Sequence, residues 1–185
     1  MIGSGHTGAG FPYIQLSEEF LVPEIEKRAK EIGYDVTFTE GYGGTIAPLA
    51  DVWEATETGQ LDFWLMASVF EPTKAMFLNF SNYLLFGVSD IPTADQIGRR
   101  MVEENRDWID PYMASYNPKL FGPTGVTQSY QLISQREVKG FDDLAGHKVS
   151  AAGGNLALLE NSGAAGVQSN LNEAYTNLQI GVYEA

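Results

Sequence analysis

The sequence contains no cysteine, which excludes disulfide bonds, thiolate metal ligands and a cysteine nucleophile. Basic residues are also scarce, because 11 Lys and Arg stand against 24 Asp and Glu and leave a formal net charge of -13. Binding to nucleic acids or to anionic membranes depends on clustered Lys and Arg side chains. We therefore expect neither nucleic acid nor another polyanion among the partners of this chain.

Long apolar runs are missing as well. No stretch reaches the roughly 18 apolar residues that a membrane-spanning helix needs, so we expect no direct membrane insertion. The N-terminus has neither the basic region nor the apolar core of a signal peptide, so the chain is either cytoplasmic or begins after a leader. Its 185 residues, 44% of them hydrophobic, suffice for a real core in one large domain or in parts of two.

The clearest predicted element is a helix near the C-terminus, in residues 170–181. Asn170 is a typical N-cap, and Glu173 three residues later can reach back to form a capping box. Apolar residues recur with helical spacing at Leu171, Ala174, Tyr175 and Leu178. Gly181 stands where a left-handed residue ends a helix. Because a short apolar step at residues 165–167 precedes it, the pattern predicts a strand, a helix and the start of a further strand.

Two more strands and a helix are predicted in the same half of the chain. Residues 128–134 alternate like a strand, and residues 149–152 form a second apolar strand. Asn155 then opens a predicted helix over residues 156–161, which Gly163 ends.

The best internal boundary is segment 120–125, which holds two glycines and a proline. We expect a first α/β lobe over residues 1–122 and the beginning of a second α/β lobe over residues 123–185.

The glycines near the N-terminus, Gly3-x-Gly5-x-x-Gly8, formally match a dinucleotide-binding fingerprint. A helix follows them, and residues 34–40 then alternate like a strand that ends in Glu40, as a ribose-binding acid would. Only two residues precede Gly3, so the sequence shows no complete strand before the loop. A dinucleotide-binding enzyme is therefore the alternative interpretation of this chain.

A second glycine-rich turn precedes another predicted helix in the first lobe. Thr45 can cap a helix over residues 46–58. Residues 61–68 are apolar on both faces, as in the central strand of a sheet covered by helices. Since ligands gather beyond the carboxyl ends of such strands, Phe70 is a candidate for the wall of a ligand cleft, with core packing as its other interpretation.

Two motifs in register resemble the solute-binding proteins of tripartite ATP-independent periplasmic (TRAP) transporters. One is G-A-x-x-V followed by x-N-x-x-E-x-Y-x-x-L-Q-x-G-V-Y, over residues 163–183. The other is F-D-D-L-A-G-H-K-V, over residues 141–149, which lies at that family's distance from the helix. The strand, Tyr-Gly-Gly-Thr turn and helix around Thr45 resemble the same family more loosely.

This resemblance implies a two-lobed α/β fold of the periplasmic-binding-protein type (type II), with its second lobe incomplete in this sequence. It implies hinge closure around a small organic solute, for which an organic acid is the expected class, and delivery of that solute to a TRAP membrane permease driven by an ion gradient. Such a protein is periplasmic, performs no chemistry on its ligand and needs no cofactor or metal. Because the chain stops where the family begins another strand, we expect it to be a fragment that lacks its leader and is marginal in stability by itself.

The resemblance also assigns candidate ligand-binding residues. His6 would project from the loop after the first strand into the cleft, although a solvent-exposed loop histidine is equally compatible with the sequence. Thr45 lies in the turn that faces the ligand. The polar candidates of the second lobe are Gln128, Tyr130, Ser150, Asn155 and Asn170, for each of which strand pairing or helix capping is the plainer interpretation.

Two of these positions depart from the family. Many TRAP binding proteins hold a substrate carboxylate with an Arg directly after the Lys-Val pair, and this position is Ser150 here. Some carry a second Arg twenty residues earlier, where this chain has Tyr130. The usual dicarboxylate or sialic-acid-like substrate is therefore doubtful. Hydroxyls and helix N-termini can still bind a carboxylate, but a less charged or aromatic solute, or a purely structural role, also fits.

Overall fold

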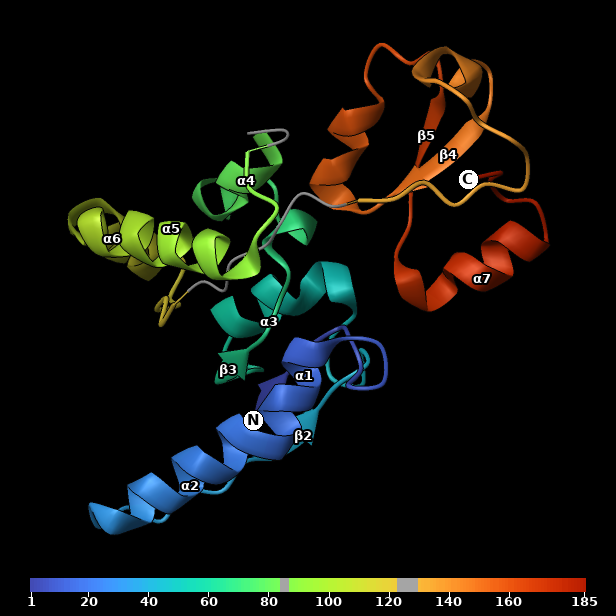
Figure 1. Ribbon diagram of the computed structural model, residues 1–185. Coiled ribbons are helices and arrows are strands. Elements are labelled where there is room, and N and C mark those ends of the chain that lie inside the picture. The colour runs from blue at the N-terminus through green and yellow to red at the C-terminus, as the bar shows by residue number, and fades with distance from the viewer. Residues whose placement is uncertain (84–86, 123–129) are drawn as a thin grey trace. The chain divides into compact units, whose positions relative to one another are not determined.

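The computed structural model describes residues 1–83, 87–122 and 130–185, and it combines helices with short parallel strands (Figure 1). The helices are α1 (Pro12–Leu16), α2 (Val22–Glu31), α3 (Val52–Glu57), α4 (Phe80–Tyr83), α5 (Ile91–Glu104), α6 (Arg106–Ser115) and α7 (Leu171–Gln179). The strands are β1 (Ile2–Gly3), β2 (Glu40–Gly41), β3 (Phe63–Trp64), β4 (Lys148–Ala151) and β5 (Ala165–Gln168). A π-helical segment, Ser17–Leu21, joins α1 to α2, and 3₁₀ helices lie at Leu49–Asp51, Ser68–Phe70, Met76–Asn79, Phe141–Leu144 and Gly153–Leu159.

The chain packs as two compact units. The first unit comprises Met1–Ala67 and Asp107–Leu120, and the second comprises Ser68–Arg106 and Phe121–Ala185. The lobe boundary expected after residue 122 stays a prediction. Of the helices in the described ranges, none combines the length and the apolar character that crossing a bilayer requires.

The first unit contains a parallel sheet in the order β2-β1-β3. Ile2 is paired with Glu40 on one side and with Phe63 on the other. The strands predicted over residues 34–40 and 61–68 are therefore present only in part, because the paired register covers only Glu40 of the first and only Phe63 and Trp64 of the second. All three strands run in the same direction, so their carboxyl ends lie at one edge of the sheet, which is where ligands bind in open α/β sheets.

The core of the first unit lies under α3. Val52, Ala55 and Leu61 are buried together, and the indole of Trp53 lies 5.4 Å from that of Trp64 between ring centroids. The helix predicted over residues 46–58 is shorter than expected, and Thr45 does not cap it. Pro48 interrupts the predicted span, because proline lacks the backbone N–H of a helix interior and disfavours helical backbone in the residue before it.

The second unit contains a two-stranded parallel sheet, in which Lys148 is paired with Ala165 and Ala151 with Gln168. On the opposite edge of β4, the N–H of Glu184 donates to the carbonyl of Lys148 at 2.9 Å, and the N–H of Ser150 donates to that of Ala185 at 2.7 Å. The last residues thus add a further extended segment to this sheet. This matches the prediction of a strand start after α7.

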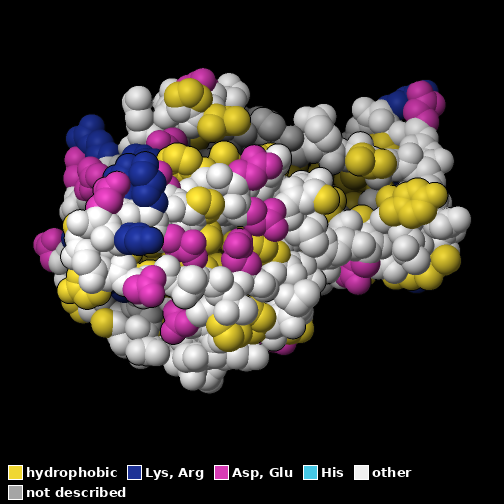
Figure 2. All heavy atoms as spheres, turned by 90° about the horizontal axis from the view of Figure 1, so that it is seen from below, with side chains coloured by type: hydrophobic (Ala, Val, Ile, Leu, Met, Phe, Trp, Pro, Cys, Tyr) yellow, Lys and Arg dark blue, Asp and Glu magenta, His cyan; other side chains and the backbone are white. Residues whose placement is uncertain are grey.

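The surface of the protein is predominantly acidic. On the face drawn in Figure 2, Asp and Glu side chains are spread widely, whereas Lys and Arg side chains gather in a few places. Several basic residues are paired with acids on their own helices, as Arg28 is with Glu24 on α2 and Arg99 with Asp95 on α5.

A close backbone approach holds together two loops of the second unit. Gly153 follows β4 directly and has a φ of +45°. A Cβ atom at Gly153 would collide with the carbonyl oxygen of Val69 and would meet the Cα of Phe70 at 3.1 Å. Because Gly153 has no side chain, the 3₁₀ helix that it begins can lie directly against the 3₁₀ turn Ser68–Phe70.

We predict that Gly153→Ala lowers the free energy of unfolding by about 1–3 kcal/mol, because the added methyl overlaps backbone and the residue must keep a left-handed conformation. Gly10→Ala is the matched control, since no atom lies within 4 Å of its Cβ position. That variant should leave stability unchanged or raise it slightly. Urea denaturation of both variants measures the difference, and an equal effect of the two substitutions would contradict the proposed contact.

Candidate functional site

The loops that follow β1 and β2 meet at the carboxyl edge of the first sheet. The N–H of Gly43 donates to the carbonyl of His6 at 2.8 Å, and the N–H of Gly44 donates to the carbonyl of Ser4 at 3.1 Å. Both glycines have left-handed backbone, with φ values of +69° and +79°, which lets the turn present consecutive N–H groups to the first loop. These bonds hold the two predicted ligand-facing loops together.

His6 lies beneath these loops, with 2% of its surface exposed. Its ring stacks on Phe11 at a centroid distance of 3.6 Å, and its Nδ1 is hydrogen bonded to the hydroxyl of Tyr13. Burial lowers the pKa of His6 from 6.5 to about 4 and raises the pKa of Tyr13 to about 12, so both groups are neutral near pH 7. The interpretation of His6 as a solvent-exposed loop residue is wrong, and its role towards a ligand stays a prediction.

An open hollow of about 510 Å³ lies beside the same loops. It is lined by Thr7, Gly8, Glu18, Glu40, Tyr42 and Thr45. Thr45 thus lies at a concave surface after β2, and its role towards a ligand stays a prediction. Burial raises the pKa of Tyr42 to about 12, with a further increase from the nearby carboxylates of Glu40 and Glu18. The hollow is thus bordered by negative charge and by neutral hydroxyls.

The dinucleotide interpretation is not favoured by this geometry. In a phosphate-binding loop, glycines leave room for a pyrophosphate to approach the backbone. Here the space beside Gly5 is filled by Leu49, and the space beside Gly8 is filled by the carboxylate of Glu18. A phosphate at this loop would meet that carboxylate, and Glu40 borders the same hollow. The two-residue strand β1 already includes Gly3, and the loop after it is not an open cradle.

In the second unit, the structure brings two predicted residues onto neighbouring segments. Phe70 is half-buried in the 3₁₀ turn Ser68–Phe70. Asn155 lies in the 3₁₀ helix Gly153–Leu159, which contacts that turn through Gly153. This helix also covers β5, because a Cβ atom at Gly166 would meet the side chain of Leu156 at 3.1 Å.

The predicted capping role of Asn155 is wrong. The helix begins two residues earlier, with Ala152 as its N-cap, because the adjacent glycines let the chain turn immediately after β4. Asn155 instead lies inside the helix, 4% exposed, and its backbone N–H donates to the carbonyl of Ala152 at 2.9 Å. Its side-chain oxygen Oδ1 is buried and has no hydrogen-bond partner.

Asn170 caps α7 as predicted. Its side-chain oxygen accepts a hydrogen bond from the N–H of Asn172 at 2.9 Å. The carboxylate of Glu173 accepts a hydrogen bond from the Asn170 amide at 3.1 Å rather than from the Asn170 backbone. Gly181, with a φ of +74°, follows the end of α7 as expected. Both polar atoms of the Asn170 side chain are therefore used within the chain.

The other three candidate ligand-binding residues take no part in the contacts of Phe70, Asn155 and Asn170, or lie outside the described residues. Ser150 is half-buried in β4. Tyr130 is 52% exposed, and the described residues 130–134 do not form the predicted strand. Gln128 lies outside the described residues. The role of each of them towards a ligand stays a prediction.

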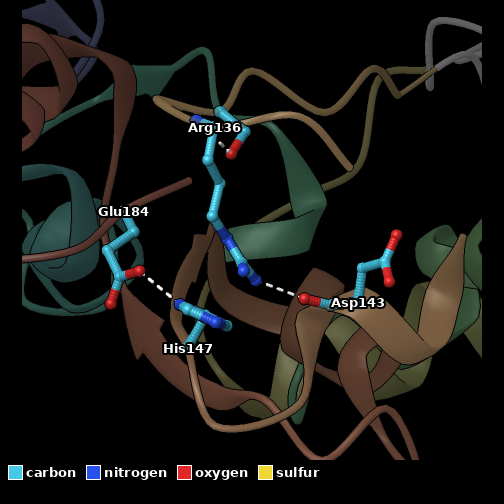
Figure 3. Close-up of polar contacts among 5 residues, drawn as sticks. Arg136, Asp143, His147 and Glu184 are labelled. Carbon is cyan, nitrogen blue, oxygen red and sulfur yellow. Dashed lines mark hydrogen bonds and ion pairs between the residues drawn. The ribbon is translucent and has the colours of Figure 1, made fainter. Parts of the chain in front are cut away.

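Pattern analysis did not identify a polar network that joins three segments of the second unit. His147 is paired with Glu184, and Arg136 donates to the backbone carbonyl of Asp143 (Figure 3). The hydrogen bond from His147 lowers the pKa of Glu184, with smaller contributions that include Arg136. These residues lie up to about fifty positions apart and share no periodicity, so no sequence signal links them. The network fastens the C-terminal residues beside β4.

Within the part of the chain that the structure describes, no group of three or more His, Asp and Glu side chains is placed to hold a metal ion. No family model matches the sequence, and no curated protein matches it either.

Solved structures of TRAP periplasmic solute-binding proteins share this fold. One from Xanthobacter autotrophicus with bound β-D-galacturonate matches with a TM-score of 0.68 and 17% identity, over 99% of this chain and 59% of that chain. One from Pseudomonas putida with bound D-glucuronate matches with a TM-score of 0.69 and 18% identity, over 99% of this chain and 58% of that chain. One from Pseudomonas aeruginosa with bound L-malate matches with a TM-score of 0.73 and 18% identity, over 100% of this chain and 62% of that chain.

These matches define the class of fold first. The chain has the α/β fold of the two-lobed periplasmic solute-binding proteins. More narrowly, the matching structures are those of TRAP transporters, so the resemblance seen in residues 141–149 and 163–183 is confirmed at the level of the fold. The chain spans 58% to 62% of the length of these three structures.

The burial of His6 generates a prediction about pH. A histidine whose pKa falls from 6.5 in the unfolded chain to about 4 in the folded one favours folding at neutral pH, and this stabilisation is lost as the pH drops from 6.5 towards 4. We expect His6→Gln to lose less stability than the wild type between pH 7 and pH 4.5. Urea denaturation at several pH values measures these losses.

His147→Gln is the control, because it removes the other histidine and leaves His6 in place. This variant should keep the acid-dependent loss. If wild type and His6→Gln lose stability in parallel, the buried neutral state of His6 is contradicted.

Proposed function

We propose that this chain is the solute-binding component of a TRAP transporter, which binds a small organic acid in the periplasm and delivers it to the membrane permease. The fold it shares with TRAP solute-binding proteins over 99% to 100% of its length carries this proposal. The matching structures hold galacturonate, glucuronate and malate, and a further one from Bordetella pertussis binds pyroglutamic acid. All four ligands are small organic acids.

The arrangement of the candidate residues supports the proposal. In each unit, loops follow the carboxyl ends of parallel strands, which is where open α/β sheets bind ligands. The function expected of such loops is reversible binding coupled to closure of the lobes, with the closed form favoured by its contacts to the solute. The protein would select its solute by complementarity and leave it chemically unchanged.

The loops at the carboxyl ends of the strands offer no cationic side chain that could form an ion pair with the carboxylate of a solute. Residues 4–8, 42–45, 65–70, 152–155 and 169–170 contain neither Lys nor Arg. Hydroxyls, side-chain amides and backbone N–H groups remain as donors, and the N-terminus of α7 adds a favourable dipole. Neutral donors of this kind suit a solute that also carries hydroxyl or amide groups.

We predict that a thermal-shift screen of the 185-residue chain identifies one class of organic acid. The panel comprises uronates, hydroxy acids, dicarboxylates, aromatic acids, sulfonates and neutral sugars, with NAD and ATP as nucleotide controls. A ligand at about 100 times its Kd stabilises the folded state by roughly 2.7 kcal/mol, which shifts the melting temperature by several degrees. Calorimetry then gives the affinity, and NMR of the recovered solute should show that it is unchanged.

A shift caused only by NAD or ATP would overturn the proposal in favour of the Gly3-Gly5-Gly8 interpretation. Stabilisation by no organic acid at millimolar concentration would also count against it. Chemical conversion of the bound solute would show an enzyme instead.

A further inference from the structure

Asn155 presents a buried hydrogen-bond acceptor that the chain leaves unused. Across residues 1–83, 87–122 and 130–185, its Oδ1 is the one buried side-chain polar atom for which no partner is found. Buried polar atoms in native proteins are almost always hydrogen bonded, because an unpaired one keeps the full penalty of its desolvation. A donor on a bound molecule would remove this penalty.

Two other asparagines show that this situation is specific to Asn155. Asn79 is equally buried, at 3% exposure, but its amide donates to the carbonyls of Ser68 and Ala75 at 2.9 Å and 3.2 Å. Asn170 follows β5 at the same sheet edge, and its oxygen is occupied by the N–H of Asn172. Of these three amides, only that of Asn155 has an oxygen available for an external donor.

Asn155 lies near the edge of the sheet at which ligands bind in open α/β folds. It lies four residues beyond the end of β4, at the carboxyl edge of the β4-β5 sheet. Gly153 fixes the start of its helix against Val69, so the side chain is held on a rigid turn. A preorganised acceptor at a sheet edge is suited to read one donor of a bound molecule.

We infer that Asn155 recognises a hydroxyl group of the solute, whose O–H donates to its Oδ1, and that the solute is accordingly a hydroxy acid. This inference rests on the proposed function and narrows it. It also fits the absence of Lys and Arg from the neighbouring loop, residues 152–155, because an amide oxygen repels a carboxylate but accepts from a hydroxyl. Galacturonate, glucuronate and malate, the ligands of three matching structures, all carry hydroxyls beside their carboxylates.

Discrimination against a deoxy analogue follows from this assignment. A solute that lacks the hydroxyl would fill the site and leave Oδ1 buried without a partner. Sites that hydrogen bond a substrate hydroxyl reject analogues without it strongly. We expect the wild type to bind L-malate about ten- to hundredfold more tightly than its deoxy analogue succinate. For a smaller site, the corresponding pair is L-lactate and propionate. The same ratio applies to any other hydroxy acid found in the screen and its matched deoxy analogue.

The test compares Asn155→Leu with Asn79→Leu in the 185-residue chain. Leucine is close to asparagine in size and removes the polar atoms. Without solute, Asn155→Leu should keep or raise the melting temperature, because it removes an unpaired buried oxygen, whereas Asn79→Leu should lower it by breaking two hydrogen bonds. With solute, Asn155→Leu should bind the hydroxy acid and its deoxy analogue with nearly equal affinity. Calorimetry of each pair measures the ratio.

The outcomes separate this inference from the function on which it rests. If the wild type binds organic acids but prefers no hydroxylated member, or if Asn155→Leu keeps the preference, the role of Asn155 is overturned and the transport function stands. If Asn155→Leu lowers the melting temperature as Asn79→Leu does and leaves the preference intact, Oδ1 is satisfied by a structural water, and the inference is equally overturned. If the wild type binds no organic acid at all, the proposed function itself has failed.

Discussion

The parallel pairing of β4 with β5 is the interaction on which the second unit depends. Four register pairs align the two strands, so the segments that follow them, Gly153–Leu159 and α7, start from the same edge. The opposite edge of β4 receives the last residues of the chain, which the pair of His147 and Glu184 holds in place. Asn155 and Asn170 lie on these two segments, so the hydrogen-bonded sheet fixes the positions of their backbones. The different environments of the two side chains follow from these positions.

The two units hold the loops at their sheet edges by different contacts. In the first, glycine N–H groups of the loop after β2 bind carbonyls of the loop after β1, and the aromatic rings of Phe11 and Tyr13 close over His6. In the second, a glycine packed against Val69 sets the turn. Both arrangements give rigid loops at a sheet edge. Rigid loops are favourable for selective binding, because little conformational freedom is lost when a ligand arrives.

Local patterns predicted the elements whose signals are local. Asn170 and Gly181 bracket α7 as expected, because capping and left-handed backbone depend on a few neighbouring residues. The helix expected after Thr45 was wrong at its start, since Pro48 outweighs a favourable cap residue. The strands around residues 34–40 and 61–68 were too long, because strand length depends on partners distant in sequence.

The candidate site was less accessible from sequence. No pattern reveals that His6 is buried against Phe11, or that Asn155 lies inside its helix without a partner, because both facts arise from packing between distant segments. In α7, by contrast, none of the residues is fully buried, and Leu171 and Tyr175 are 72% and 78% exposed. A nine-residue helix without a buried face is marginal, so it depends on its end contacts. Its amide protons should therefore exchange through local fraying well before the β4-β5 sheet opens, so the N-terminal end of α7 can adjust its position without disturbing the strands.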